Sequence, residues 1–170
     1  MKKRIQFLNT SVDNLSMSET IEIIDNTISR QENLQHVVVN AGKIVDMQKD
    51  NDLRKSVNSC NLINADGQSV VWASHFLGLP LKERVAGIDL MENLVELAFK
   101  NNYKAYFLGA KEEVVKKVVD IYSKKYSKDI IAGYRNGYFS KEQEKDIARD
   151  IADSKAQLLF VAITSPKKEI

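Results

Sequence analysis

The sequence predicts an α/β protein of the Rossmann-like class, with a mostly parallel sheet flanked by helices on both faces. Two observations lead to this prediction. Short apolar runs, rich in β-branched and aromatic residues, recur along the chain, and longer segments with helical spacing lie between them. Strands that are nearly continuous in apolar residues and alternate with helices are typical of a parallel sheet whose two faces are both buried.

Six apolar runs are predicted to be strands, because β-branched and aromatic side chains fit a pleated, buried surface. In chain order they read RIQFLN, HVVVN, NLIN, KAYFLG, DIIAGY and QLLFVAI. Ligands of sheets in this class bind beyond the carboxyl ends of the strands. The residues that follow each run are therefore the first candidates for a site.

The predicted helices carry apolar side chains at spacings of three and four residues. The clearest pattern covers Lys111–Tyr126, where valines form one face and charged residues form the other. Pairs of capping-box form at Ser16–Glu19 and Ser140–Gln143 predict helices that begin near Met17 and Lys141. Further helical segments are predicted at Lys43–Val57, Gly67–Leu77 and Leu90–Ala98.

Length and composition narrow the class of protein. A chain of 170 residues without repeats or Pro-, Gly- or Ser-rich linkers predicts a single domain over residues 1–170. A net charge of +2 is too small to indicate nucleic acid as a partner. The single cysteine, Cys60, excludes an internal disulfide. Because no signal peptide and no apolar run of spanning length is present, we expect a cytoplasmic protein.

Polar and glycine residues follow the predicted strands. Loops are polar in most proteins, so one such position says little, but their gathering at one predicted edge of the sheet favours a site. The positions are Asn40, Asn64–Gly67, Gly109, Gly133 with Tyr134, and Thr164–Lys168.

Asp66 lies between an apolar run and a helical segment, and it has two interpretations. As a structural residue it would be the N-cap of the helix Gly67–Leu77. As a chemical residue it would be a carboxylate at the mouth of the sheet, beside a glycine, Gly67, that lets a substrate approach the backbone. Both roles are compatible with each other.

The segment ERVAGIDL places an arginine, a glycine and an acid ahead of another helix. Asp89 is expected at the N-cap or in the first turn, where it complements the helix dipole. Arg84 has no local helical role, and it is either a solvated loop charge or a planar donor suited to a diphosphate.

Two glycine-containing segments follow later strands. Gly109, in YFLGAKEEV, comes between a strand and a helix start, an arrangement that offers backbone N–H groups to an anion. The chain has neither a dinucleotide-binding fingerprint nor a P-loop. In GYRNGYFS, Gly137 is expected to allow a turn, and Tyr138 is either at the edge of the core or a surface on which a base stacks.

No metal or cofactor is predicted. His36, His75 and Cys60 lack the spacing of zinc ligands. Asp50 and Asp52 resemble the acidic pair that holds a metal in many sugar transferases, but they lie in the helical stretch Lys43–Val57. Side chains two residues apart on a helix diverge, so a solvated face is the better interpretation.

Six segments, taken in order, resemble motifs of the WecG/TagA/CpsF family of bacterial glycosyltransferases. They are VVVNAGKIV, NADGQSVVW, ERVAGIDL, YFLGAKEEV, NGYF and SPKKE, within a likeness that runs from about Val37 to Glu169. Each segment alone has little specificity, whereas six in the same order are specific.

The resemblance implies transfer of an N-acetylmannosamine-type sugar from a UDP-sugar donor to a polyprenyl-diphosphate-linked sugar, in synthesis of wall teichoic acid or a related cell-surface polysaccharide. It implies a metal-independent, inverting reaction with Asp66 as general base, and with Asn40 and Arg84 in the pocket for the donor or diphosphate. The other implied substrate-binding residues are Gly67, Gly87, Asp89, Gly109, Gly137, Tyr138 and Lys168.

The sequence departs from the family pattern at three places. Val38 stands where the family has a hydrogen-bonding threonine, and Lys168 stands at a glutamine position. The chain ends at Ile170, whereas members continue with a C-terminal segment that covers the site and engages the membrane. We therefore expect that segment to be absent and a partner or homo-oligomer to cover the site. We also expect peripheral contact of the protein with the inner face of the plasma membrane. The alternatives are a catalytically impaired nucleotide-sugar binding module and an oligomerising structural domain.

Overall fold

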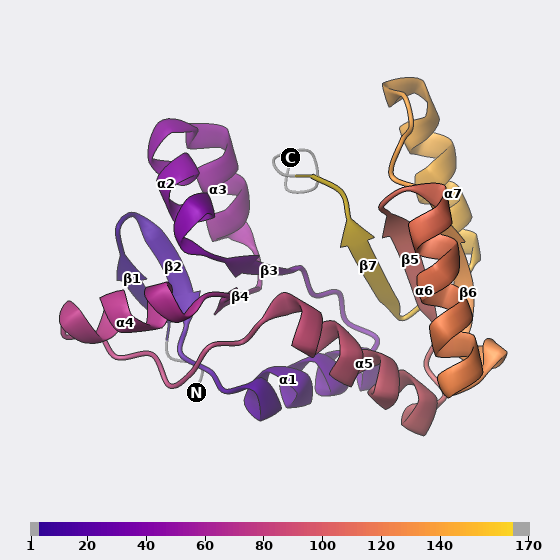
Figure 1. Ribbon diagram of the computed structural model, residues 1–170, viewed down its shortest axis with the longest axis horizontal. Coiled ribbons are helices and arrows are strands. Elements are labelled where there is room, and N and C mark those ends of the chain that lie inside the picture. Colours follow the sequence, from indigo (N-terminus) through magenta and orange to yellow (C-terminus); the bar gives the residue numbers. More distant parts are fainter. Residues whose placement is uncertain (1–3, 165–170) are drawn as a thin grey trace. The chain divides into compact units, whose positions relative to one another are not determined.

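The structure is a computed structural model that describes residues 4–164 (Figure 1). These residues divide into two compact units, one ending at Leu90 and the other beginning at Met91. Each unit contains parallel strands flanked by helices, so the predicted α/β class is confirmed. The single domain over residues 1–170 stays a prediction.

The elements of the first unit follow one another in this order: β1 (Arg4–Phe7), β2 (Thr10–Asp13), α1 (Met17–Ser29), β3 (His36–Val39), α2 (Ala41–Lys49), α3 (Asn51–Ser59), β4 (Leu62–Ala65) and α4 (Gln68–Phe76). Helix α5 (Gly87–Asn101) begins in this unit. The second unit contains β5 (Ala105–Gly109), α6 (Glu112–Lys125), η1 (Lys128–Ile130), β6 (Ile131–Arg135), η2 (Lys141–Gln143), α7 (Glu144–Asp153) and β7 (Leu158–Ala162).

In the first unit, β3 and β4 form a parallel pair and β1 and β2 form an antiparallel hairpin. The alternation of side chains along β4 assigns a helix layer to each face of the pair. Ile63 belongs to the apolar core that includes Met47 of α2 and Val57 of α3. Asn64 points the other way and reaches Thr20 of α1. Figure 1 shows α2 and α3 on one side of these strands and α1 on the other.

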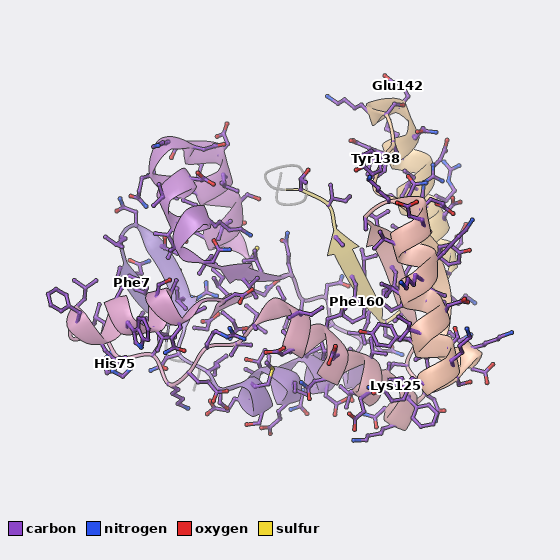
Figure 2. The ribbon with its side chains drawn as sticks, in the orientation of Figure 1. Phe7, His75, Lys125, Tyr138, Glu142 and Phe160 are labelled. Atoms are coloured by element: carbon purple, nitrogen blue, oxygen red, sulfur yellow. The ribbon has the colours of Figure 1, made fainter. Side chains whose placement is uncertain are left out.

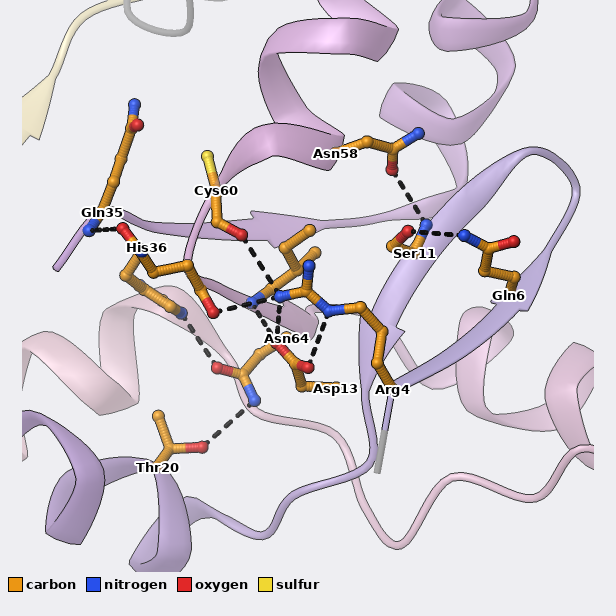
Figure 3. A network of polar contacts seen from close by, with 12 residues as sticks. Arg4, Gln6, Ser11, Asp13, Thr20, Gln35, His36, Asn58, Cys60 and Asn64 are labelled. Carbon is orange, nitrogen blue, oxygen red and sulfur yellow. Dashed lines mark hydrogen bonds and ion pairs between the residues drawn. The ribbon is translucent and has the colours of Figure 1, made fainter. Parts of the chain in front are cut away.

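A buried polar network joins the hairpin to β4 (Figure 3). Asp13, only 1% exposed, accepts two hydrogen bonds of 2.9 Å from the Arg4 guanidinium. Its Oδ2 also accepts the backbone N–H of Ile63 at 2.8 Å. The Arg4 pKa is raised, chiefly by its hydrogen bond with Asp13. The Asp13 carboxylate therefore holds β4 in place, and Asp66 is the residue that directly follows this strand.

A second buried contact holds the same strand from the opposite face. The Asn64 side chain is fully buried, its Nδ2 donates to Thr20 Oγ1 at 3.1 Å, and its Oδ1 lies 2.9 Å from His36 Nε2. A buried amide needs such partners, because an unpaired one costs free energy. Strands β3 and β4 are thus joined to α1 by side chains as well as to each other by backbone.

In the second unit, β5 lies between β6 and β7, and all three strands are parallel. Phe107 stacks on Tyr122 of α6 with ring centroids 5.9 Å apart, and on Phe160 of β7 (Figure 2). Its neighbours on the strand, Tyr106 and Leu108, pack with Ile147 of α7. Because successive side chains point to opposite faces, α6 and α7 cover opposite faces of this sheet, as predicted.

Two predicted helices differ from the structure. The stretch Lys43–Val57 is two helices, since the Asp50 side chain accepts the N–H groups of Asp52 and Leu53 and starts α3. The prediction that Asp50 lies on a solvated helix face was therefore wrong, because it is an N-cap. The capping box at Ser140 is present, but it opens the short 3₁₀ turn η2, and α7 begins only at Glu144.

Strand β2 was not among the predicted strands. All four of its residues are buried although three are polar.

Within residues 4–164, no helix has both the length and the apolar character required to cross a membrane.

Candidate active site

Asp66 directly follows β4 and is held at the carboxyl end of the parallel pair. Its backbone N–H donates to the carbonyl oxygen of Val39, the last residue of β3, at 2.8 Å. The segment before α5 lies against the same strand, because the N–H of Val85 donates to the carbonyl of Ala65 at 2.8 Å. Asp66 is partly exposed, so its carboxylate is open to solvent at this strand edge.

The Asp66 carboxylate faces the start of α5. Its Oδ2 accepts the backbone N–H of Gly87, the first residue of that helix, at 3.3 Å. An N–H group at a helix N-terminus is a favourable partner for an anion. The other carboxylate oxygen has no partner among residues 4–164. One oxygen is therefore anchored while the second is available.

The predicted capping role of Asp66 was wrong. Helix α4 begins at Gln68, its N-cap is Gly67, and that cap has no side-chain hydrogen bond. Gly67 has a φ of 153°, which glycine adopts at little cost. The Asp66 side chain therefore does not cap α4, the helix that follows it. It accepts a hydrogen bond from the first residue of α5 instead.

Gly87 lets α5 approach the strand closely. A Cβ at this position would lie 3.3 Å from Val38 Cγ2 and 3.7 Å from Asp66 Oδ2. The Val38 side chain therefore borders the point where the carboxylate meets the helix. A threonine hydroxyl at this position would replace a methyl group next to the start of α5, the helix to which the carboxylate is anchored.

Asn40 is the N-cap of α2, and its Oδ1 accepts the N–H of Lys43 at 2.9 Å. Its side chain also borders the Asp66 loop, since a Cβ built on Gly67 would be 3.7 Å from Asn40 Cβ. The residue is exposed, and its Nδ2 has no partner among residues 4–164. That amide can donate to a ligand without loss of the cap.

Arg84 and Asp89 form an ion pair, with Nη2 and Oδ2 3.2 Å apart. Asp89 lies in the first turn of α5, as predicted. Both side chains are exposed, and such pairs contribute little to stability in water. A phosphate can therefore replace Asp89 as a partner of the guanidinium at small cost.

An open pocket of about 490 Å³ lies beside these residues on the first unit. It was not predicted. The sequence signal is the segment Gly67–Leu81, which contains no Asp, Glu, Lys or Arg and precedes Lys82 and Arg84. The lining residues are Gln68, Val71, Trp72, His75, Lys82, Glu83 and Arg84.

The loop that carries Lys82 is tied to the start of α1. Lys82 Nζ donates to Glu19, and the backbone N–H of Ser16 donates to the other Glu19 oxygen in the predicted capping box. Glu83 accepts the backbone N–H of Met17. These contacts hold the pocket wall against the helix.

The Glu19 contacts give the protein an acid-sensitive element. The hydrogen bond from Lys82, followed by that from Ser16, lowers the Glu19 pKa from 4.5 to about 2. Because the folded pKa is depressed, this stabilisation is fully present above pH 4.5 and is lost as the pH falls towards about 2. We expect Glu19→Gln to flatten the fall of Tm in that window, with Glu22→Gln on the same helix as control. Equal acid slopes for wild type and Glu19→Gln would contradict this.

The second unit brings together three further predicted residues. The N–H of Gly137 donates to the Ala110 carbonyl at 2.9 Å, and a Cβ on Gly137 would lie 3.0 Å from the Cα of Gly109. Gly109 has a φ of 125°, and its Cβ would be 2.4 Å from the carbonyl oxygen of Ala162. The ends of β5, β6 and β7 therefore meet closely only because these positions are glycine.

Tyr138 follows this junction and is 72% exposed, so its ring is not part of the core edge (Figure 2). Its N–H donates to Asn136 Oδ1 at 3.0 Å. An exposed ring next to a tight backbone junction is suited to stacking on a base. Lys168, also predicted to bind substrate, lies outside the described residues.

Within residues 4–164, no group of three or more His, Cys, Asp or Glu side chains is arranged to hold a metal ion. The structure thus groups Asn40, Asp66, Gly67, Arg84, Gly87 and Asp89 in the first unit, and Gly109, Gly137 and Tyr138 in the second.

Comparison with known proteins adds a family and two informative relatives. The model of the "Glycosyl transferase WecG/TagA/CpsF family" matches residues 5–170. The chain is 31% identical over 168 residues to an N-acetylglucosaminyldiphosphoundecaprenol N-acetyl-beta-D-mannosaminyltransferase of Staphylococcus aureus (strain NCTC 8325 / PS 47), covering 98% of this chain and 65% of that protein. It is 35% identical over 121 residues to a protein of the same name from Bacillus subtilis (strain 168), covering 71% and 46%. The chain spans less than two thirds of either relative's length.

Proposed function

Because the chain belongs to the WecG/TagA/CpsF family of glycosyltransferases, we propose that it carries the catalytic base of a sugar transferase. The donor is a UDP-linked N-acetylmannosamine-type sugar, and the acceptor is a sugar on a polyprenyl diphosphate. The names of the relatives support the transferred sugar and the acceptor. The observation that carries the proposal is the Asp66 carboxylate, anchored by Gly87 through one oxygen and with the other oxygen available.

The proposed reaction is a single displacement that inverts the anomeric carbon. The acceptor hydroxyl oxygen attacks that carbon, the bond from the carbon to the UDP oxygen breaks, and UDP leaves with the electron pair. The available oxygen of Asp66 takes the hydroxyl proton. One positioned carboxylate is sufficient for this chemistry. Anchoring by Gly87 holds the carboxylate in a fixed direction towards the incoming hydroxyl.

Asn40 and Arg84 are assigned to phosphate or donor contacts. The Asn40 amide has an available donor beside Gly67, and the Arg84 guanidinium has an exposed ion pair that a diphosphate can replace. The second unit, taken by itself, has an exposed ring, Tyr138, next to the backbone of Gly109 and Gly137. A polyprenyl-linked acceptor resides in a membrane, so we place the reaction at a membrane surface, on its cytoplasmic side.

The proposal is tested by incubating the protein with UDP-N-acetylmannosamine and a detergent-dispersed GlcNAc-diphosphate-lipid. We expect UDP release that depends on the acceptor, and a disaccharide-lipid product resolved by chromatography. Calorimetry with UDP on the same preparation distinguishes this transferase from a second candidate function, that of a catalytically impaired binding module. Binding of UDP without turnover indicates the nucleotide-sugar binding module, which the absence of a hydroxyl at Val38 favours. UDP that leaves Tm unchanged at millimolar concentration argues against both.

Val38→Thr is expected to raise kcat/KM for transfer by roughly 10-fold, the scale of one hydrogen bond to a charged group. Threonine has nearly the same volume as valine, and its hydroxyl would lie next to the start of α5, where the Asp66 carboxylate is anchored. The rate measurement is compared with Val37→Thr as control. Val37 is a buried core residue on the same strand. The variant Val37→Thr is therefore expected to be less stable than the wild type, without a gain in kcat/KM. A decrease in kcat/KM for Val38→Thr at unchanged stability would contradict the assignment.

A further inference from the structure

The segment from Gly67 to Leu81 contains no Asp, Glu, Lys or Arg, in a chain of which 28% is charged. It comprises α4 and the loop after it, and its only titratable side chain is His75 (Figure 2). Pattern analysis would assign such a segment to the core. The structure buries only part of it, chiefly Val70, Val71 and Leu81.

The other face of this segment exposes large apolar side chains. Trp72 is 68% exposed and Phe76 is 91% exposed, and their spacing of four residues places them on the same side of α4. Leu77 and Leu79, in the loop that follows, are also exposed. We call these four residues the apolar ridge. Exposed aromatic side chains in a contiguous apolar segment mark an interaction surface.

Cationic side chains lie beside the ridge. Trp72 lines the open pocket together with His75, Lys82 and Arg84. The pocket also contains Glu83, whose carboxylate accepts the N–H of Met17. Lys82 and Arg84 form ion pairs with Glu19 and Asp89, respectively, and both cationic side chains are about half exposed, so a phosphate can approach them from solvent. Aromatic residues next to Lys and Arg are typical of surfaces that rest at a membrane interface.

We infer that the apolar ridge is a docking surface for an anionic lipid bilayer. Trp72 and Phe76 enter the boundary between headgroups and acyl chains, and Lys82 contacts lipid phosphates. The segment from Gly67 to Leu81 contains no acidic residue that the negatively charged headgroups would repel. Docking in this way places the pocket that Trp72 and Arg84 line against the bilayer, where, under the proposed function, the acceptor resides.

The test uses Trp72, the only tryptophan of the chain. On addition of vesicles of phosphatidylcholine and phosphatidylglycerol, we expect its emission to shift to the blue, to be protected from iodide and to be quenched by lipids with brominated acyl chains. Vesicles of phosphatidylcholine alone should give a smaller effect. Unchanged emission, together with no co-sedimentation, would overturn the inference.

Variants test whether the ridge is the contact. Phe76→Ser is expected to weaken binding to the anionic vesicles by roughly 10-fold or more, because an aromatic side chain is no longer buried in the bilayer. Ile121→Ser is the matched control, since Ile121 is 51% exposed on α6 and is remote in sequence from the ridge. Both variants should keep the wild-type Tm. Equal loss of binding in the two variants would overturn the assignment to the ridge.

A second copy of the chain is the competing occupant. It would produce a blue shift that grows with protein concentration in the absence of lipid, with dimers in sedimentation velocity that Phe76→Ser abolishes. That outcome overturns the inference.

Failure of the inference and failure of the proposed function can be distinguished. Asp66→Asn should bind vesicles like the wild type. Phe76→Ser should retain transfer to a short-chain, water-soluble acceptor and lose it with a long-chain acceptor in vesicles. Transfer with normal vesicle binding by Phe76→Ser leaves the proposed function intact and overturns the docking surface.

Discussion

Asp66→Asn is expected to lower turnover in the transfer assay by about 10²- to 10⁴-fold, the contribution of a positioned general base. Asparagine has nearly the same shape and can still accept the N–H of Gly87, so the local structure is retained. It cannot accept the hydroxyl proton. The expected signature is therefore a fall in kcat with little change in UDP affinity or Tm.

The control for this variant is Asp52→Asn. Asp52 is an exposed carboxylate in the first turn of α3, in the same unit, and its replacement is expected to leave turnover unchanged. Turnover near the wild-type rate in Asp66→Asn would remove Asp66 from the mechanism. A similar loss in both variants would point to a general effect of charge.

Asp13→Ala is expected to destabilise the first unit by about 1–3 kcal/mol, the cost of leaving a buried hydrogen-bonding group without its partner. The change leaves the Arg4 guanidinium without its carboxylate and leaves the buried N–H of Ile63 without an acceptor. The free energy of unfolding, from urea titration, measures the effect.

Asp46→Ala serves as the control for Asp13→Ala, because Asp46 is exposed on α2 in the same unit. Its replacement is expected to change stability by less than about 0.5 kcal/mol. A loss below about 1 kcal/mol for Asp13→Ala would show that the network does not hold β4 in place.

Hydrophobic pattern alone predicted the strands around the site but not β2. Strands β3 (His36–Val39) and β4 (Leu62–Ala65) are composed mostly of apolar residues, which predicts their burial. Strand β2 is buried with polar side chains, and its Asp13 accepts hydrogen bonds from Arg4 and from the backbone N–H of Ile63, which lies far along the chain. A local pattern contains no information about that partner. The break at Asp50 was missed because one capping side chain divided an otherwise continuous helical pattern.

The candidate site was also predicted only in part, because local sequence does not identify contacts between residues far apart in the chain. Position after a strand identified Asp66 and Asn40. Local spacing then suggested that Asp66 caps the next helix, whereas its partner is Gly87, brought close by a loop that pairs with β4. The apolar ridge was missed because the sequence of an uncharged helix does not distinguish its exposed apolar face from its buried one, and only the folded structure shows Trp72 and Phe76 at the surface.

Chemical rescue is the sharpest test of whether the Asp66 carboxylate is the base. Asp66→Ala removes the carboxylate and leaves a space beside Gly87 and Gly67. We expect almost no transfer by this variant and a saturable rise in rate when formate is added, with chloride at the same ionic strength giving none. Transfer by Asp66→Ala at the wild-type rate without formate would exclude Asp66 as the base.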